Sequence, residues 1–159
     1  MAQQHKHSFS YTVFEHIAEL PLPDQQLIEA AQKAAQNAYA PYSRFCVGAA
    51  VRLANDEILV GNNQENASYP AGCCAERVAL FQASACYPNT PVLQIAIAAH
   101  SDLHDTSNPI TPCGICRQTL AEYANRQPQP RVVLLCGGNG QVIRVENALD
   151  LLPLSFSLK

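Results

Sequence analysis

Two short stretches decide how this chain folds, Cys74-Ala75-Glu76-Arg77 and Pro112-Cys113-Gly114-Ile115-Cys116. Each stands where a polar loop gives way to a helical pattern, over about residues 74–85 and 114–125. The pattern therefore places each group of cysteines at the start of a helix. Because side chains in a first turn lean toward the helix N-terminus, both groups can face one point in front of the two helices.

The three cysteines of these two stretches are suited to bind a single zinc ion. Cys113 and Cys116 are three residues apart, a spacing that lets a first helical turn present both sulfurs to one ion. Together with Cys74 they supply three thiolates and leave a tetrahedral zinc ion one open position, which is typical of a catalytic site. Such a site lowers the pKa of a bound water to about 7, and Glu76 can take the proton.

The charges around such a site favour the same interpretation. Three thiolates on a divalent ion give a net negative centre, which weakens its Lewis acidity. Two helix N-termini each bring about half a positive charge, and Arg77 adds a full one within reach of the thiolates. We expect these charges to restore the ability of the metal to activate water.

The cysteines also permit two other interpretations. Cys113 and Cys116 could form a redox pair, but no matching βαβ pattern precedes them. A closed structural zinc site would need a fourth ligand, and Cys73 is the candidate, although adjacent residues seldom both reach one ion. The remaining cysteines, Cys46, Cys86 and Cys136, lie in apolar contexts and are predicted to be small core residues.

Composition limits the class of protein. The 159 residues are 48% hydrophobic and 14% charged, which indicates one globular domain and excludes a disordered chain. A formal charge of -3 lacks the basic excess of proteins that bind nucleic acid or an anionic membrane surface. We find neither a secretory signal pattern nor an apolar run of about 18 residues, so we expect a cytoplasmic protein whose thiols stay reduced.

The rest of the pattern predicts alternating helices and strands. Asp24 is expected to be the N-cap of a helix that runs to Ala38. Strands are expected over residues 46–53, 58–62, 92–99, 131–136 and 141–145, and a short helix over residues 146–152. Phe9, Tyr11 and Val13 alternate with polar residues like a strand, but nothing indicates a partner for it.

This order predicts an α/β fold of three layers, with helices on both faces of a five-stranded mixed sheet. An N-terminal arm over residues 1–23 would precede one domain over residues 24–159.

The chain resembles the small homotetrameric zinc-dependent cytidine deaminases. Cys-x-Glu followed by Pro-Cys-x-x-Cys is the zinc-deaminase pattern, with Cys where other members carry His. The likeness runs from about Asp24 to Phe156 in ordered blocks, at residues 40–43, 45, 47–50, 61–63, 65–67, 74–77, 112–114, 116–118 and 151–153. The resemblance implies hydrolytic deamination of cytidine and deoxycytidine to uridine and deoxyuridine with release of ammonia, a step of pyrimidine salvage.

The resemblance also implies roles for single residues. Cys74, Cys113 and Cys116 would hold one zinc ion per chain, and Glu76 would shuttle protons. Arg77 would hydrogen-bond the thiolates. The implied substrate contacts are Phe45, Asn63, Glu65, Ala75, Tyr69 and Phe156. Tyr69 and Phe156 would reach in from neighbouring subunits of a homotetramer with shared active sites, and the partner would be a small nucleoside rather than nucleic acid or a membrane.

Two segments depart from the family pattern. The arm over residues 1–23 is extra, and the loop over residues 101–111 is longer and more polar than the usual connection. Two rival functions are a deaminase of another aminopyrimidine or modified nucleoside and a non-catalytic zinc-containing nucleoside-binding protein. Glu76 argues against the second, because a binding protein has no need of a proton shuttle.

Overall fold

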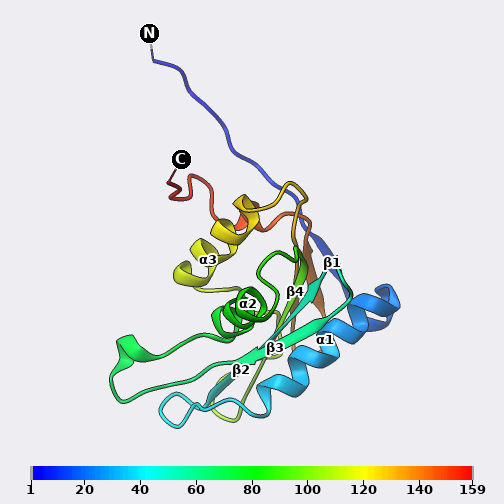
Figure 1. Cartoon of the computed structure of the whole chain (residues 1–159). Coiled ribbons are helices and arrows are strands. Elements are labelled where there is room, and N and C mark those ends of the chain that lie inside the picture. The colour runs from blue at the N-terminus through cyan, green and yellow to red at the C-terminus, as the bar shows by residue number, and fades with distance from the viewer. Residues whose placement is uncertain (1, 159) are drawn as a thin grey trace.

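A computed structural model describes residues 2–158 and has three layers (Figure 1). Helix α1 covers one face of a mixed sheet, and helices α2 and α3 cover the other. The elements in chain order are β1 (Thr12–Phe14), η1 (Ile17–Glu19), α1 (Leu22–Ala35), β2 (Phe45–Leu53), β3 (Ile58–Asn62), η2 (Tyr69–Ala71), α2 (Ala75–Cys86), β4 (Val92–Ser101), α3 (Gly114–Asn125), β5 (Val132–Cys136), β6 (Val142–Val145) and η3 (Ala148–Leu151). The predicted α/β fold with helices on both faces is confirmed.

The sheet has six strands within the described residues, in the order β1-β6-β5-β4-β2-β3, so the prediction of five is wrong. The additional strand is β1, which pairs antiparallel with β6 so that Val13 stands opposite Ile143. The alternation around Val13 indicated an extended conformation. It could not indicate the partner, because strand pairing is not a local property of the sequence.

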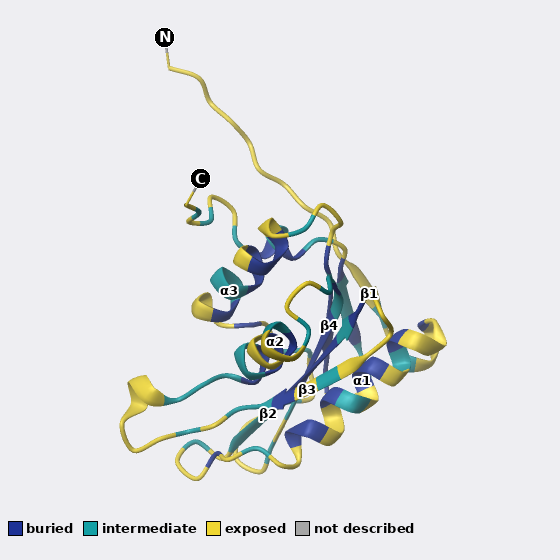
Figure 2. Cartoon of the chain, in the orientation of Figure 1, coloured by how far each residue is buried: buried dark blue, intermediate teal, exposed yellow. Residues whose placement is uncertain are grey.

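The central strands are buried on both faces (Figure 2). Strand β4 pairs antiparallel with β2 and parallel with β5. Since successive side chains of a strand point to opposite faces, Ile95 packs under α2 and α3 while Ala96 packs under α1. Leu134 and Leu135 divide between the two cores in the same way.

Gly61 in β3 sets the distance between the sheet and the start of α2. A Cβ atom added there would stand 2.5 Å from the Ala79 nitrogen and 2.7 Å from the Ala75 carbonyl oxygen. Any larger residue would push the helix away, so Gly61 allows α2 to lie directly on the strand. This contact fixes the position of the first turn of α2, which carries Glu76.

Helix α1 begins earlier than the sequence suggests. Its N-cap is Pro21 and Pro23 lies in its first turn, where proline costs no hydrogen bond. The prediction that Asp24 caps the helix is wrong. Asp24 is buried, at 4% exposed, and its side chain instead accepts from Gln94 Nε2 at 2.9 Å and pairs with Arg144 Nη1 at 2.5 Å. The helix ends at Ala35 rather than at the predicted Ala38, because the N–H groups of Asn37 and Ala38 bond to carbonyls three residues back, which forms turns instead of a further α-helical turn.

The predicted core cysteines divide into three environments. Cys136 is buried, as expected, and burial raises the pKa of its thiol to about 11. Cys46 is half-buried. Cys86 is exposed at the last position of α2, so its assignment to the core is wrong.

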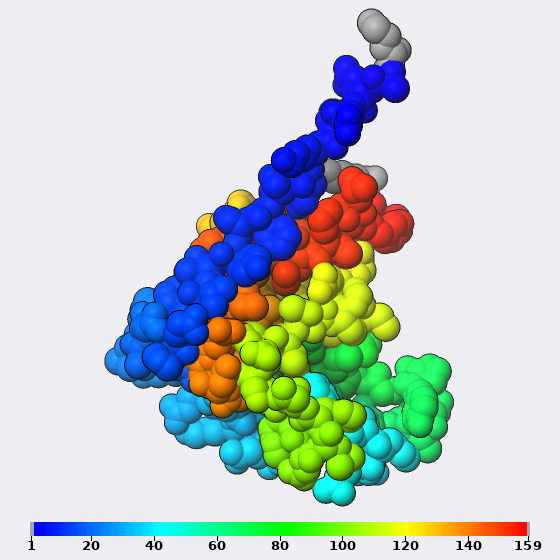
Figure 3. Space-filling view, turned by 180° about the vertical axis from the view of Figure 1, so that it is seen from behind, coloured from blue at the N-terminus to red at the C-terminus, as the bar shows by residue number. Residues whose placement is uncertain are grey.

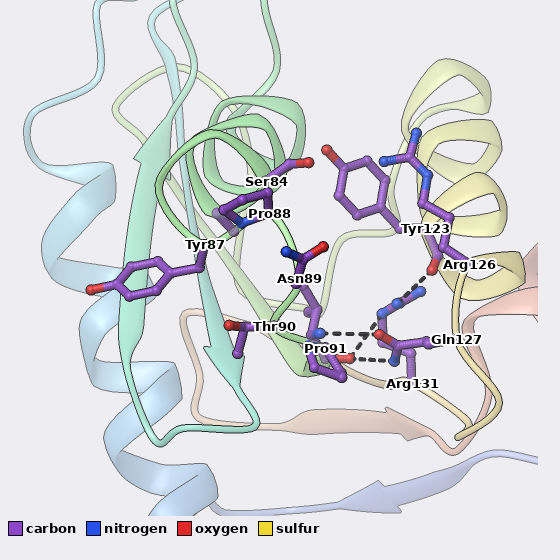
Figure 4. A pocket seen from close by; sticks show the side chains of 12 residues that line it. Ser84, Tyr87, Pro88, Asn89, Thr90, Pro91, Tyr123, Arg126, Gln127 and Arg131 are labelled. Carbon is purple, nitrogen blue, oxygen red and sulfur yellow. Dashed lines mark hydrogen bonds between the residues drawn. The ribbon is translucent and has the colours of Figure 1, made fainter.

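A pocket of about 250 Å³ lies beyond the C-terminal end of α2, away from the cysteine-bearing first turn (Figure 4). Arg131 is 1% exposed there, and it donates from Nε to the Val92 carbonyl at 3.1 Å and from Nη2 to the Tyr123 carbonyl at 2.6 Å. Gln127 exchanges two further hydrogen bonds with the Val92 backbone. These contacts tie the start of β4 to the end of α3, which is a structural role.

None of the helices within residues 2–158 combines the length and apolar character that a membrane span requires.

Candidate metal centre and active site

The first turns of α2 and α3 bring three cysteines together. Cys74 is the N-cap of α2, Cys113 is the N-cap of α3, and Cys116 lies in the first turn of α3. Their sulfur atoms all lie within 4.8 Å of one another, and Cys74 Sγ is 3.9 Å from Cys113 Sγ. Zinc prefers sulfur and nitrogen ligands, so this group can bind one zinc ion.

The surroundings favour the ionised form of Cys74. The contact with the Cys116 thiol, followed by the contacts with Arg77 and Cys113, lowers the pKa of Cys74 to about 5 against the opposing effect of burial. The same contact raises the pKa of Cys116 in the absence of a metal. A thiolate is the form of cysteine that ligates metals, so Cys74 is ready to bind at neutral pH.

Cys73 stays outside this group. Burial raises the pKa of its thiol, and its sulfur is not part of the cluster that Cys74, Cys113 and Cys116 form. The described residues therefore offer three ligands from cysteine, histidine, aspartate and glutamate at this point, not four. This geometry favours an open site over the closed structural one.

Arg77 lies beside the sulfurs. Its Nη2 donates to the Gly72 carbonyl at 3.2 Å and lies 3.9 Å from Cys74 Sγ. The guanidinium is thus held between the loop before α2 and the thiolate. A cation in a helix first turn opposes the helix dipole, and the neighbouring thiolate offsets that cost.

Glu76 is the buried carboxyl group of the site. It is 4% exposed in the first turn of α2. Burial raises the pKa of Glu76, and the charge of Cys74 contributes to the rise. A carboxyl group whose pKa moves toward neutrality can both accept and donate a proton, which is the requirement for a general acid and base.

A pocket of about 610 Å³ opens in front of Cys74. It brings together three of the residues implied as substrate contacts, Asn63, Glu65 and Tyr69, with Cys74 and Arg77. Residues without a predicted role also line this pocket, and Tyr42 is one of them. The Tyr42 ring stands edge-on to the Tyr69 ring, with 6.1 Å between the ring centroids. Tyr42 belongs to the block over residues 40–43 that resembles the family, and that block could have indicated its place in the pocket.

Asn63 and Glu65 both hold the neighbouring backbone. Asn63 accepts from the Val47 N–H at 2.7 Å and donates to the Phe45 carbonyl at 2.9 Å. Glu65 Oε2 accepts from the N–H groups of Tyr42 at 2.8 Å and Ser43 at 3.3 Å. The hydrogen bond with the Ser43 side chain lowers the pKa of Glu65 most, and the bonds from the Tyr42 and Ser43 backbone also lower it. Glu65 is therefore a carboxylate at neutral pH.

The structure does not bring Phe156 to the cysteines of its own chain. Phe156 is 69% exposed and lines a separate hollow with Phe81, between α2 and α3. Its carbonyl accepts from Gln118 Nε2 at 2.9 Å. Tyr69, at 75% exposed, projects into solvent at the mouth of the pocket. Both rings are therefore available to a neighbouring molecule.

Two helix N-termini that carry Cys-x-Glu and Pro-Cys-x-x-Cys over a mixed sheet define the class of zinc-dependent base deaminases. Residues 22–133 match the family model described as the cytidine and deoxycytidylate deaminase zinc-binding region. The chain belongs to this family, as the sequence predicted.

Individual relatives agree with the family match. The chain is 41% identical to the cytidine deaminase of Halalkalibacterium halodurans over 84% of this chain and 93% of that protein. It is 37% identical to the cytidine deaminase of Sporosarcina psychrophila over 84% of this chain and 90% of that protein. Among solved structures, the cytidine deaminase from Burkholderia pseudomallei superposes with a TM-score of 0.72 at 44% identity and covers 82% of this chain and 97% of that one. The cytidine deaminase from Mycobacterium tuberculosis gives a TM-score of 0.65 at 30% identity, over 84% and 96%.

Proposed function

We propose that this chain is a zinc-dependent cytidine deaminase that hydrolyses cytidine and deoxycytidine to uridine and deoxyuridine and releases ammonia. One observation carries the proposal. Three sulfurs within 4.8 Å of one another stand at two helix N-termini, and a buried carboxyl group follows the first of them by two residues. The family match and the cytidine deaminases similar to this chain support the same activity.

The chemistry divides between a metal and one carboxyl group. A zinc ion held by Cys74, Cys113 and Cys116 supplies a Lewis acid that makes water acidic. Glu76 takes a proton from the attacking water and delivers it to N3 of the pyrimidine as the C4–O bond forms. Glu76 then carries the hydroxyl proton to the amino group, and the C4–N bond breaks to release ammonia.

The proposed substrate contacts include both polar groups and an aromatic ring. We assign Asn63 and Glu65 to the ribose hydroxyls, because an amide and a carboxylate together can donate to and accept from a diol. Glu65 Oε1 and the second Asn63 amide proton remain for this after the backbone contacts described above. The Ala75 N–H begins α2 and has no partner within the helix, so we assign it to the pyrimidine O2. We assign Phe45 to a contact with the ring.

The pocket favours a free nucleoside over a nucleotide. Arg77 is the one lysine or arginine among the described residues that line it, and the Gly72 carbonyl and Cys74 already hold this guanidinium. A phosphate would therefore meet no free cation there. The net charge of -3 likewise supports a substrate other than nucleic acid.

We further propose a homotetramer in which Tyr69 and Phe156 complete the active sites of neighbouring subunits. Both rings are exposed, and Phe156 shares its hollow with a second exposed ring, Phe81. Grouped exposed apolar side chains are typical of a protein–protein contact, which supports this arrangement. The seven free cysteines support action in the reducing cytoplasm, where the reaction would serve pyrimidine salvage.

The activity is tested with purified protein and a panel of cytidine, deoxycytidine, cytosine and deoxycytidine monophosphate. Loss of cytidine absorbance and release of ammonia are expected for the two nucleosides. Turnover of the monophosphate but not of the nucleosides would contradict the proposal. So would zinc-dependent binding of cytidine without any ammonia release, which is the behaviour of a binding protein.

A further inference from the structure

The long polar loop after β4 is anchored to the start of β2. Phe45 stands opposite Ser101 in the sheet, and Ser101 Oγ donates to the Arg44 carbonyl at 2.7 Å. Arg44 also pairs with Asp102 at 3.2 Å. The φ angle of Arg44 is 53°, a left-handed conformation that non-glycine residues adopt only when their surroundings hold it. The loop therefore holds the backbone and side chain of Arg44, the residue before Phe45, in place.

A turn then directs His104 toward Phe45. Ser101 Oγ accepts from the backbone N–H groups of Leu103 and His104, each at 3.2 Å. The turn folds the loop back, and the ring centroids of His104 and Phe45 lie 6.0 Å apart with planes inclined at 60°. This separation and tilt fall in the range that favours contacts between aromatic rings.

The far half of the loop rests on the turn between β5 and β6. The N–H groups of Gly138 and Asn139 donate to the carbonyls of Thr106 at 2.8 Å and Ser107 at 3.0 Å. A Cβ atom added to Gly137 would stand 2.8 Å from the Pro109 nitrogen, so only glycine admits the loop here. In Figure 3 the loop, in yellow-green, lies on the surface beside the orange segment that contains this turn.

We propose that this loop fixes His104 beside Phe45 and that His104 is a positioning residue that holds the Phe45 ring against the pyrimidine. The proposal rests on the proposed function, which assigns Phe45 to the ring of the substrate. A ring that is already immobilised loses no rotamer freedom when the nucleoside binds, so the contact strengthens binding without entering the chemistry.

The test compares three variants of the zinc-loaded enzyme. His104→Ala removes the ring that backs Phe45, and His104→Phe keeps a ring there. Leu103→Ala changes an exposed neighbour on the same loop and is the matched control. The readouts are KM and kcat for cytidine, the equilibrium affinity for uridine, which is the unreactive product, and the zinc content.

His104→Ala is expected to raise KM and to weaken uridine binding by the same factor, about three- to tenfold. Its kcat and zinc content should stay unchanged, because it touches neither Glu76 nor the cysteines. His104→Phe should restore most of the affinity, and Leu103→Ala should behave like the original chain. Asp102→Ala, which removes the ion pair with Arg44, should also weaken uridine binding.

Two outcomes overturn the inference. One is a KM and uridine affinity in His104→Ala equal to those of Leu103→Ala. The other is a joint loss of kcat or zinc, which would indicate general damage to the fold. Measurements on the unaltered enzyme distinguish these two outcomes from a failure of the proposed function. If it neither deaminates cytidine nor binds uridine, the assignment of a nucleoside is wrong and the inference falls with it.

Discussion

Gly48 of β2 lies so close to Ala31 of α1 that a Cβ atom added to the glycine would overlap the Ala31 carbonyl oxygen. The same atom would stand 3.0 Å from the Cα of Ala35, one turn further along the helix. Both obstacles are helix backbone, which cannot move aside as a flexible side chain can. The helix and the strand whose first residue is Phe45 are thus in direct backbone contact.

Gly48→Ala is therefore expected to destabilise the fold strongly, by about 3 kcal/mol or more, because overpacking must displace all of α1. Urea unfolding followed by circular dichroism measures the change. Gly114→Ala is the matched control, since a Cβ at Gly114 meets nothing within 4 Å. Equal unfolding midpoints for the two variants would contradict the close packing.

Zinc content provides a second prediction. The purified protein should carry one zinc ion per chain, and X-ray absorption should show three sulfurs and one light atom around it. Cys113→Ser should lose most of the metal because it removes one of three thiolates. Cys86→Ser, at an exposed cysteine outside the cluster, should retain it. A fourth sulfur in the absorption spectrum would indicate a closed site and would contradict the catalytic interpretation.

Glu76→Gln should separate proton transfer from metal binding. The amide keeps the size of the buried side chain but cannot shuttle protons, so kcat for cytidine should fall by about 10²–10⁴-fold. Zinc content should be unchanged. Glu57→Gln, at an exposed carboxylate, controls for a general effect of lost charge. Turnover of Glu76→Gln near that of the control would mean that another group moves the proton.

Arg77→Ala should change the pH dependence of the reaction. Loss of the cation beside Cys74 makes the site more negative, and a more negative site holds its protons more tightly. The acidic limb of the pH–rate profile should therefore move to higher pH, and the rate at neutral pH should fall. Arg126→Ala removes a cation remote from the cysteines and should leave the profile in place. An unchanged profile for Arg77→Ala would exclude charge relief by this residue.

Phe156→Ala tests whether the active site is shared. If the ring covers a neighbour's pyrimidine, KM should rise by one to two orders of magnitude, since stacking on a base contributes about 1–3 kcal/mol. Leu158→Ala alters another exposed residue of the same tail and should have little effect.

Mixing Phe156→Ala with Glu76→Gln subunits then tests the crossing. Shared sites would give mixed oligomers in which some sites carry both lesions and others neither, so activity would depart from the average of the parents. Activity equal to that average after verified subunit exchange would place Phe156 in a patch of its own domain.

The directions of the three cysteine side chains could be predicted because each direction is set locally. Cys74, Cys113 and Cys116 each lie within one turn of a helix start, where the helix itself fixes the direction of the side chain. Spacing along the chain was therefore enough to pair Cys113 with Cys116. The approach of Cys74, which is 39 residues before Cys113, followed instead from the likeness to the zinc-deaminase pattern. Local reasoning failed for Asp24, because its partners Gln94 and Arg144 come from strands far along the sequence.

The walls of the pocket were less accessible to prediction from sequence. The family resemblance pointed to Asn63 and Glu65 but not to their contacts with the backbone over residues 42–47. The loop that carries His104 gave only a polar composition. Its position depends on Gly137 and Ser101, which it meets through tertiary packing that no periodic pattern records.

The pairing of β1 with β6 has a consequence for biosynthesis. Of the described strands, β1 leaves the ribosome first and β6 last, and Ile143 stands 130 positions after its partner Val13. During translation β1 must remain without a partner while the other five strands emerge. The sheet is therefore completed only after β6 has emerged, and the slow closure of this long-range contact is expected to come late in folding. A chain that stalls before β6 would expose both β1 and the free edge of β5, which makes it a ready substrate for chaperones.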